Sequence, residues 1–180
     1  MIEITLDRLG YYTPYILFFL SLIVIKKRNA FFYYYIGGFI LNYVLNVQLK
    51  AILKQPRPDS NVALLNIMKQ DGRYVHPQMY GMPSGHAQES FYSLLYVCWL
   101  IKDKLDKQNK NILFVFGLLC IIMMFQRVMT KKHTILQIGI GSIVGGMVGI
   151  FFYKMAEQQV KGIDREREDD DNEIQEGFVH

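Results

Sequence analysis

Three short polar blocks stand out in a largely apolar chain, and their residue types suit chemistry on a phosphate group. The blocks read Lys50-x6-Arg57-Pro58, Pro83-Ser84-Gly85-His86 and Gln126-Arg127-x5-His133. They supply cations, imidazoles and a Ser-Gly turn that exposes backbone N–H groups. Phosphoryl transfer needs neutralised oxygens, an in-line nucleophile and an acid for the leaving group. The inventory predicts cleavage of a phosphate ester or diphosphate, with no metal and no other cofactor.

The individual residue types agree with this chemistry. Arg57 and Arg127 can each grip two phosphate oxygens, and Lys50 adds a point charge. His86 and His133 each begin an apolar segment, and the N-terminus of a helix attracts anions through its free N–H groups. The glycine between Ser84 and His86 suits a backbone that must approach a ligand closely. The three blocks therefore predict one anion-binding site.

Gln137 lies four residues after His133, so the two side chains share a helix face. The amide oxygen of Gln137 can accept a hydrogen bond from Nδ1–H of His133 and thereby set its tautomer. It cannot stabilise a cationic imidazolium as a carboxylate would. We expect the surrounding cations to keep His133 neutral, as a nucleophile requires.

The elements that must position these blocks are membrane spans. Hydrophobic residues make up 51% of the 180-residue chain, and they form long uncharged runs instead of amphipathic stripes. The runs cover residues 11–25, 31–49, 112–125 and 134–153, and residues 87–101 carry only Glu89. We predict an all-α, polytopic membrane bundle of about five transmembrane helices, with residues 1–153 as one transmembrane domain.

The order of the spans places the three blocks together. The first block follows the second span, the second block precedes the third span, and the third block lies between the fourth and fifth spans. All three therefore fall on the same face of the membrane. If the three blocks were unrelated, nothing would require them to lie on the same membrane face as well as to carry residues suited to phosphate.

The charge of the chain is divided unevenly. Residues 154–180 carry a net charge of −5 and residues 1–153 a net charge of +9. The polar, acidic composition of residues 154–180 predicts a disordered tail. Once Lys50, Arg57 and Arg127 are assigned to the site, the remaining Lys and Arg favour a cytoplasmic tail and a lumenal or exoplasmic site. The shortest runs suit a thin bilayer, so we expect the endoplasmic reticulum or another endomembrane.

The blocks resemble the three-part signature of the type 2 phosphatidic acid phosphatase superfamily. That signature reads Lys-x6-Arg-Pro, then Pro-Ser-Gly-His, then Ser-Arg-x5-His-x3-Asp. The first two blocks match in full, and the third has Gln126 in place of Ser and Gln137 in place of Asp. A glutamine inside His-Thr-x-x-Gln is similar to the dolichyl-diphosphatase branch.

The resemblance implies a role for each site residue. His133 would be the nucleophile that forms a phosphohistidine, and His86 would be the general acid and later the base. The phosphate oxygens would be held by Lys50, Arg57, Arg127, Ser84 and the Gly85 N–H. The implied partners are a lipid phosphate or diphosphate and the surrounding membrane lipids, with no nucleic acid. Dolichyl or another polyprenyl diphosphate is the favoured substrate. Two alternatives stay open: a phosphatase of phosphatidate or another lipid monophosphate, and a catalytically weak protein that binds anionic lipids.

Other polar or reactive residues are interpreted more simply. Glu89 lies three residues after His86 inside a span, where acids are functional candidates by default. One turn below the interface it could instead pair with a basic neighbour, and we favour that structural interpretation. Cys98 and Cys120 lie in different spans and predict neither a disulfide nor a metal site. Lys54 is expected to contact lipid headgroups.

Overall fold

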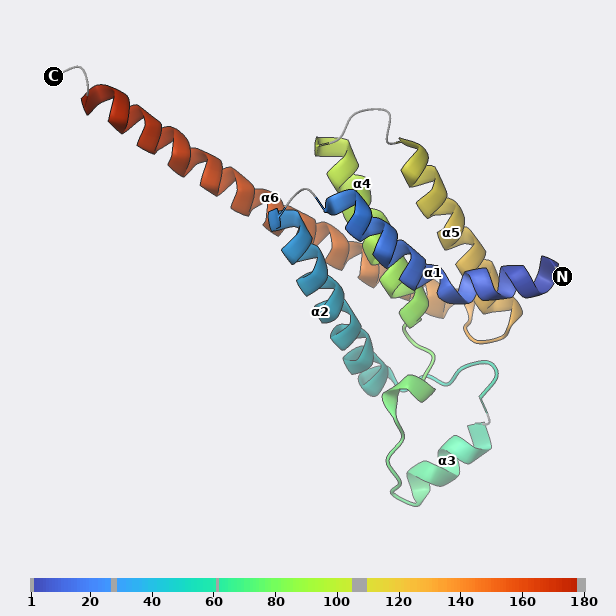
Figure 1. Cartoon of the computed structure of the whole chain (residues 1–180). Helices are drawn as coiled ribbons and strands as arrows, with labels where there is room; N and C mark the ends of the chain where they lie inside the picture. The colour runs from blue at the N-terminus through green and yellow to red at the C-terminus, as the bar shows by residue number, and fades with distance from the viewer. Residues whose placement is uncertain (1, 27–28, 61, 105–109, 178–180) are drawn as a thin grey trace.

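Our computed structural model describes residues 2–26, 29–60, 62–104 and 110–177. Every regular element in these ranges is helical, which confirms the predicted all-α class. The elements are α1 (Ile2–Ile25), α2 (Asn29–Leu53), α3 (Val62–Gln70), the short 3-10 helix η1 (Pro77–Met79), α4 (Gly85–Lys104), α5 (Lys110–Met129) and α6 (Ile135–Gly177). The small elements α3 and η1 fold the long α2–α4 connection, for which no helix was predicted (Figure 1).

Four helices in the described ranges are long and apolar enough to cross a membrane. They cover Thr5–Ile25, Asn29–Leu53, Asn111–Met129 and Ile135–Arg167. The fifth predicted span is α4, which has 20 residues but is not among these four helices, because Gln88, Glu89, Ser90 and Ser93 interrupt its apolar run. Figure 1 shows why it can be more polar: α4 lies among α1, α5 and α6, and it also contacts α2. Gln88, Ser90 and Ser93 of α4 are accordingly fully buried among the helices.

Close packing of α4 against α6 brings the second and third blocks together. Gly141, Gly145 and Gly149 recur every four residues along one face of α6. A Cβ atom at any of them would collide with the backbone of α4 or of the residue just before it, so only glycine allows this approach. The two helices consequently start side by side, and the backbone N–H of Ser84 donates to the carbonyl of Gln137 at 3.0 Å.

A cluster of buried hydroxyl groups joins α2 to α4 at the end of the bundle away from the three blocks. The hydroxyl of Tyr92 donates to the carbonyl of Tyr35 at 2.8 Å, and that of Tyr96 donates to the carbonyl of Phe31 at 2.7 Å. The Tyr35 hydroxyl lies 2.8 Å from that of Ser93. Because these groups are buried, each bond satisfies an atom that lipid could not. This cluster fixes the frame on which the site is built.

Helix α6 continues without a break to Gly177, whereas the sequence analysis expected a disordered tail from residue 154. Lys161 and Glu157 form an ion pair at 2.6 Å across one turn of this extension. Pairs at this spacing favour helix, so the helix does not end where the apolar run ends. The loop residues 27–28 and 105–109, whose charges entered the orientation prediction, lie outside the described residues.

Candidate active site

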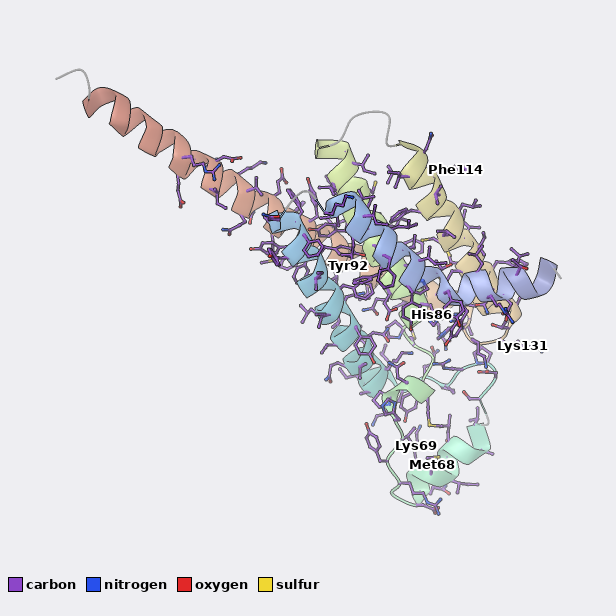
Figure 2. All side chains as sticks on the ribbon, in the orientation of Figure 1. Met68, Lys69, His86, Tyr92, Phe114 and Lys131 are labelled. Carbon is purple, nitrogen blue, oxygen red and sulfur yellow. The ribbon has the colours of Figure 1, made fainter. Side chains whose placement is uncertain are left out.

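The three blocks meet in one pocket of about 220 Å³ near the starts of α4 and α6. The predicted residues that line it are Lys50, Arg57, Gly85, His86, Arg127 and His133. Ser84 and Gln137 are fully buried beside them. Figure 2 shows His86 at the loop end of α4, whereas Tyr92 on the same helix lies inside the bundle. The structure therefore gathers every predicted site residue at one end of the bundle.

Two of the cations are oriented by the connection between α2 and α4. Lys50, in the last turn of α2, is buried, and its Nζ donates to the carbonyl of Tyr80 at 2.8 Å. Nη2 of Arg57 donates to the carbonyl of Gln78 at 2.7 Å. Both acceptors are backbone atoms in or just after η1, so the folded connection aims both cations.

Several buried polar atoms around the pocket have no hydrogen-bond partner among the described residues. They are Nε of Arg57, Nε and Nη2 of Arg127, Oγ of Ser84 and Nε2 of His86. A buried polar group without a partner costs about 1–3 kcal/mol, so their gathering requires an explanation. Burial also lowers the pKa of the Arg57 guanidinium. An anion with several oxygens would accept hydrogen bonds from these atoms, and its negative charge would offset the positive charge of the buried arginines.

His133 is held neutral by its surroundings. It lies in the short connection between α5 and α6 and is only 4% exposed. Burial lowers its pKa to about 3, and the charges of Arg57 and Lys50 act in the same direction. The lowered pKa agrees with the expectation from the sequence that His133 is neutral, although burial lowers it more than the cations do. At neutral pH the ring therefore has a free lone pair.

The orientation of Gln137 decides which nitrogen of His133 carries that lone pair. Nε2 of Gln137 donates to the carbonyl of Pro56 and to Oε1 of Gln55, both at 3.0 Å. Because a carbonyl can only accept, the amide oxygen must face the other way. That oxygen lies 3.3 Å from Nδ1 of His133 and also accepts from the N–H of Thr134 at 3.2 Å. The proton of His133 consequently lies on Nδ1, and Nε2 is free.

The Ser84-Gly85 turn forms the start of α4. The carbonyl of Ser84 accepts the N–H of Gln88 at 3.0 Å, while its hydroxyl is one of the unpartnered polar atoms. A Cβ atom at Gly85 would lie only 3.2 Å from Oδ1 of Asn46. The glycine thus leaves room for the Asn46 side chain of α2 beside the turn.

The pocket also contains residues that the sequence analysis did not assign to it. Glu89 lines the pocket, and no ion pair involves it within the described ranges, so the favoured pairing is not seen. Its neighbouring charges are Arg127 and Lys50. Asn46 also lines the pocket. The one feature of the sequence that pointed to this position is its spacing of four residues before Lys50, which places both side chains on one helix face.

Two basic residues near the blocks have other contacts. Lys54 lies in a separate surface hollow with Lys69 and Arg73, in keeping with its predicted place outside the site. Lys132 pairs with Asp59 at 2.5 Å and joins the third block to the α2–α3 connection. The hydrogen bond from Lys132 lowers the pKa of Asp59.

Comparison with known proteins points to one family. The model of the PAP2 superfamily matches residues 31–161, which include all three blocks. "Lipid phosphate phosphatase epsilon 1, chloroplastic" of Arabidopsis thaliana is 31% identical over 121 residues, covering 66% of this chain and 38% of that protein. "Dolichyldiphosphatase" of Saccharomyces cerevisiae is 29% identical over 123 residues, covering 64% of this chain and 48% of that protein. The chain thus spans less than half the length of either relative, and no solved structure matches it.

Proposed function

This chain belongs to the PAP2 superfamily, and on that premise we propose that it is a membrane phosphatase that hydrolyses a lipid phosphate. The favoured substrate is dolichyl or another polyprenyl diphosphate. The observation that carries the proposal is the set of buried, unpartnered polar atoms that surrounds two histidines in one pocket. Such a set fits a phosphoryl group, whose oxygens accept several hydrogen bonds at once.

The first step transfers the phosphoryl group to the protein. The arginines, Lys50 and the Ser84-Gly85 turn hold the phosphate oxygens while Nε2 of His133 attacks phosphorus. The bond between phosphorus and the leaving oxygen breaks, and His86, which starts this step as the imidazolium, donates its Nε2 proton to that oxygen and becomes neutral. The fixed Nδ1–H···Oε1 contact with Gln137 keeps the attacking lone pair of His133 aimed at the pocket.

The second step releases inorganic phosphate. A water molecule attacks the phosphorus of phosphohistidine 133, and Nε2 of His86 takes a proton from that water. The bond between phosphorus and His133 breaks, which restores the free lone pair on Nε2 and the protonated state of His86. The two histidines therefore divide nucleophilic and acid–base work, and the cations stabilise the charge that develops in both steps.

The pocket walls support a lipid in preference to a soluble ester. Tyr15 of α1 and Tyr43 of α2 line the pocket, yet they are 55% and 49% exposed on membrane-crossing helices. The pocket therefore reaches the lipid-facing surface between α1 and α2. A phosphate bound there can keep its hydrocarbon chain in the bilayer, which a water-soluble substrate would not need.

A lipid monophosphate is the second candidate, and it is favoured by the name of the Arabidopsis thaliana relative, a lipid phosphate phosphatase. The catalytic groups are the same for both classes, because the reacting phosphoryl group is the same. The choice depends on whether the leaving group is a phosphate or an alcohol. The proposal for a diphosphate rests on the Saccharomyces cerevisiae relative and on Gln137 in the third block.

Phosphate release by the purified protein in detergent tests the proposal. Dolichyl diphosphate and phosphatidate are assayed in parallel with wild type, His133→Ala and the control His76→Ala. His76 is a matched control because it is exposed and caps η1 outside the pocket. We expect release that His133→Ala abolishes and His76→Ala retains, with the faster substrate identifying the class. Binding of either lipid without release would instead identify a lipid-binding protein.

A further inference from the structure

We propose that Asn46 and Glu89 are further catalytic residues, whose side-chain oxygens accept hydrogen bonds from the water molecule that attacks phosphohistidine 133. The inference rests on the proposed function, in which His133 carries the phosphoryl group and His86 takes a proton from that water. Both residues line the pocket, and neither belongs to the three blocks. Their role concerns the second step of the reaction.

Hydrogen-bond acceptors in this pocket require an explanation of their own. The oxygens of a phosphate group are acceptors, so they bind the arginines, Lys50 and the Ser84-Gly85 turn, which are donors. Side-chain oxygens that face the same pocket cannot bond to an unprotonated phosphate oxygen. They need a ligand with protons to donate, and the reaction itself brings one such ligand, the attacking water.

Two main-chain carbonyls fix the orientation of the Asn46 amide. Nε2 of Gln88 donates to the carbonyl of Asn42 at 2.9 Å, so Oε1 of Gln88 faces the other way and accepts from Nδ2 of Asn46 at 2.8 Å. Nδ2 of Asn46 also donates to the carbonyl of Pro83 at 3.3 Å. Because a carbonyl can only accept, the nitrogen of Asn46 must hold this place, and Oδ1 is turned away from it.

Oδ1 of Asn46 is thereby left free beside the start of α4. It lies 3.2 Å from the position that a Cβ atom of Gly85 would take, and no donor from the described residues bonds to it. Asn46 is only 2% exposed, yet it lines the pocket, so the pocket is where this oxygen can meet a donor. His86 directly follows Gly85, which places the Asn46 oxygen next to the residue that activates the water.

Glu89 supplies a second acceptor from α4. It lies three residues after His86, so the two side chains share a helix face, and both line the pocket. Its carboxyl group makes no ion pair or hydrogen bond with any described residue. A carboxyl group keeps an accepting oxygen whether or not it is protonated. An acid that only stabilised a membrane bundle would have a partner, so the open position of Glu89 in the pocket indicates that it binds a ligand.

The two acceptors complete the requirements of the attacking water. Water has two protons, and His86 takes only one of them in the second step. Acceptors for the other proton orient the water so that its lone pair points at phosphorus. The new bond then forms between the water oxygen and phosphorus, the bond to His133 breaks, and no proton passes to Asn46 or Glu89. The first step involves no water, so it does not need these two residues.

The decay of the covalent intermediate tests this inference without a lipid. The purified protein is phosphorylated with potassium phosphoramidate, a small phosphoryl donor, and the rate of loading is recorded by mass spectrometry after quenching with alkali. The donor is then removed, and the loss of the phosphoryl group from His133 is followed in the same way. The variants are Glu89→Met and Asn46→Leu, which remove the acceptors, and Glu89→Gln, which returns a neutral one. Ser90→Ala is the matched control, because Ser90 is buried on α4 and does not line the pocket.

We expect Glu89→Met and Asn46→Leu to slow the decay about tenfold or more while loading stays near the wild-type rate. Glu89→Gln should recover part of the loss, and Ser90→Ala should behave as wild type. A purely structural role would slow loading and decay alike, so that result, or an unchanged decay in Glu89→Met, would overturn the inference. If the wild type acquires no phosphoryl group from phosphoramidate or from lipid, the proposed function fails, and the inference fails with it.

Discussion

The two histidines of the proposed active site are held by different kinds of contact. His133 lies in a connection between helices, and its Nδ1 is held by the side-chain amide of Gln137, which is itself oriented by Pro56 and Gln55. His86 lies at the start of α4, and its ring lies beside that of Tyr11 of α1, with the ring centroids 5.5 Å apart. One histidine of the site is therefore oriented by a hydrogen bond in a connection, and the other is positioned by packing between helices.

This difference has consequences for mutation. A single substitution at position 137 removes the support of His133. A substitution at position 11 would remove the ring that packs beside His86.

Replacing His86 by alanine should separate the roles of the two rings. We expect a loss of about 10²–10⁴-fold in kcat on phosphatidate, whose alcohol leaving group needs a proton, and a smaller loss on 4-nitrophenyl phosphate. His133→Ala should abolish turnover of both, since no leaving group replaces a nucleophile. The same loss on both substrates for His86→Ala would mean that His86 is not the acid.

Replacing Gln137 by leucine should weaken the support of His133 without removing the nucleophile. Leucine keeps the volume but cannot accept Nδ1–H, so we expect kcat to fall about 10- to 100-fold with a small change in KM. Thr134→Val is the matched control, because it removes only the bond from the Gln137 N–H to the Thr134 hydroxyl at 3.2 Å. Equal effects of the two variants would show that Gln137 acts only on local folding.

The depressed pKa of His133 predicts how stability depends on pH. The unfolded chain binds a proton at this residue near pH 6.5, whereas the folded protein resists protonation until about pH 3. The contribution of His133 to stability is therefore complete above pH 6.5 and declines as the pH falls toward 3. Thermal unfolding in detergent at pH 8 and pH 5 measures this. His133→Gln should lose less stability than wild type over that interval, and an equal loss would contradict the prediction.

Chelation should have the smallest effect. If the two imidazoles and the buried cations carry the whole reaction, EDTA leaves phosphate release unchanged. The measurement is the initial rate before and after dialysis against EDTA, with a metal-dependent phosphatase treated in parallel as a control. If EDTA abolishes activity and added metal restores it, then a metal, and not His86, activates the attacking water.

Much of the site could be predicted from the sequence because side chains carry recognisable chemistry. The order of the spans placed Lys50, Arg57 and the two histidines on one face, and the four-residue spacing placed Gln137 beside His133. The backbone acceptors could not be predicted in the same way. The carbonyls of Tyr80 and Gln78 belong to groups that every residue has, so only the fold reveals that they accept from Lys50 and Arg57.

Other features depend on packing that composition does not report. The central position of α4 explains how a more polar helix belongs to the bundle, and the stripe of glycines on α6 sets how closely the two helices pack. Glu89 was interpreted as a structural ion pair because its neighbours were unknown, and the structure places it in the pocket wall.

Trapping the covalent intermediate shows whether His133 is the nucleophile. The protein is mixed with lipid substrate, quenched with alkali within the first turnover and digested, and the phosphorylated peptide is identified by mass spectrometry. We predict an alkali-stable, acid-labile phosphoryl group on His133, which is absent from His133→Ala and accumulates in His86→Ala with a substrate that has a good leaving group. A phosphoryl group on His86, or active wild type that never carries one, would contradict the account.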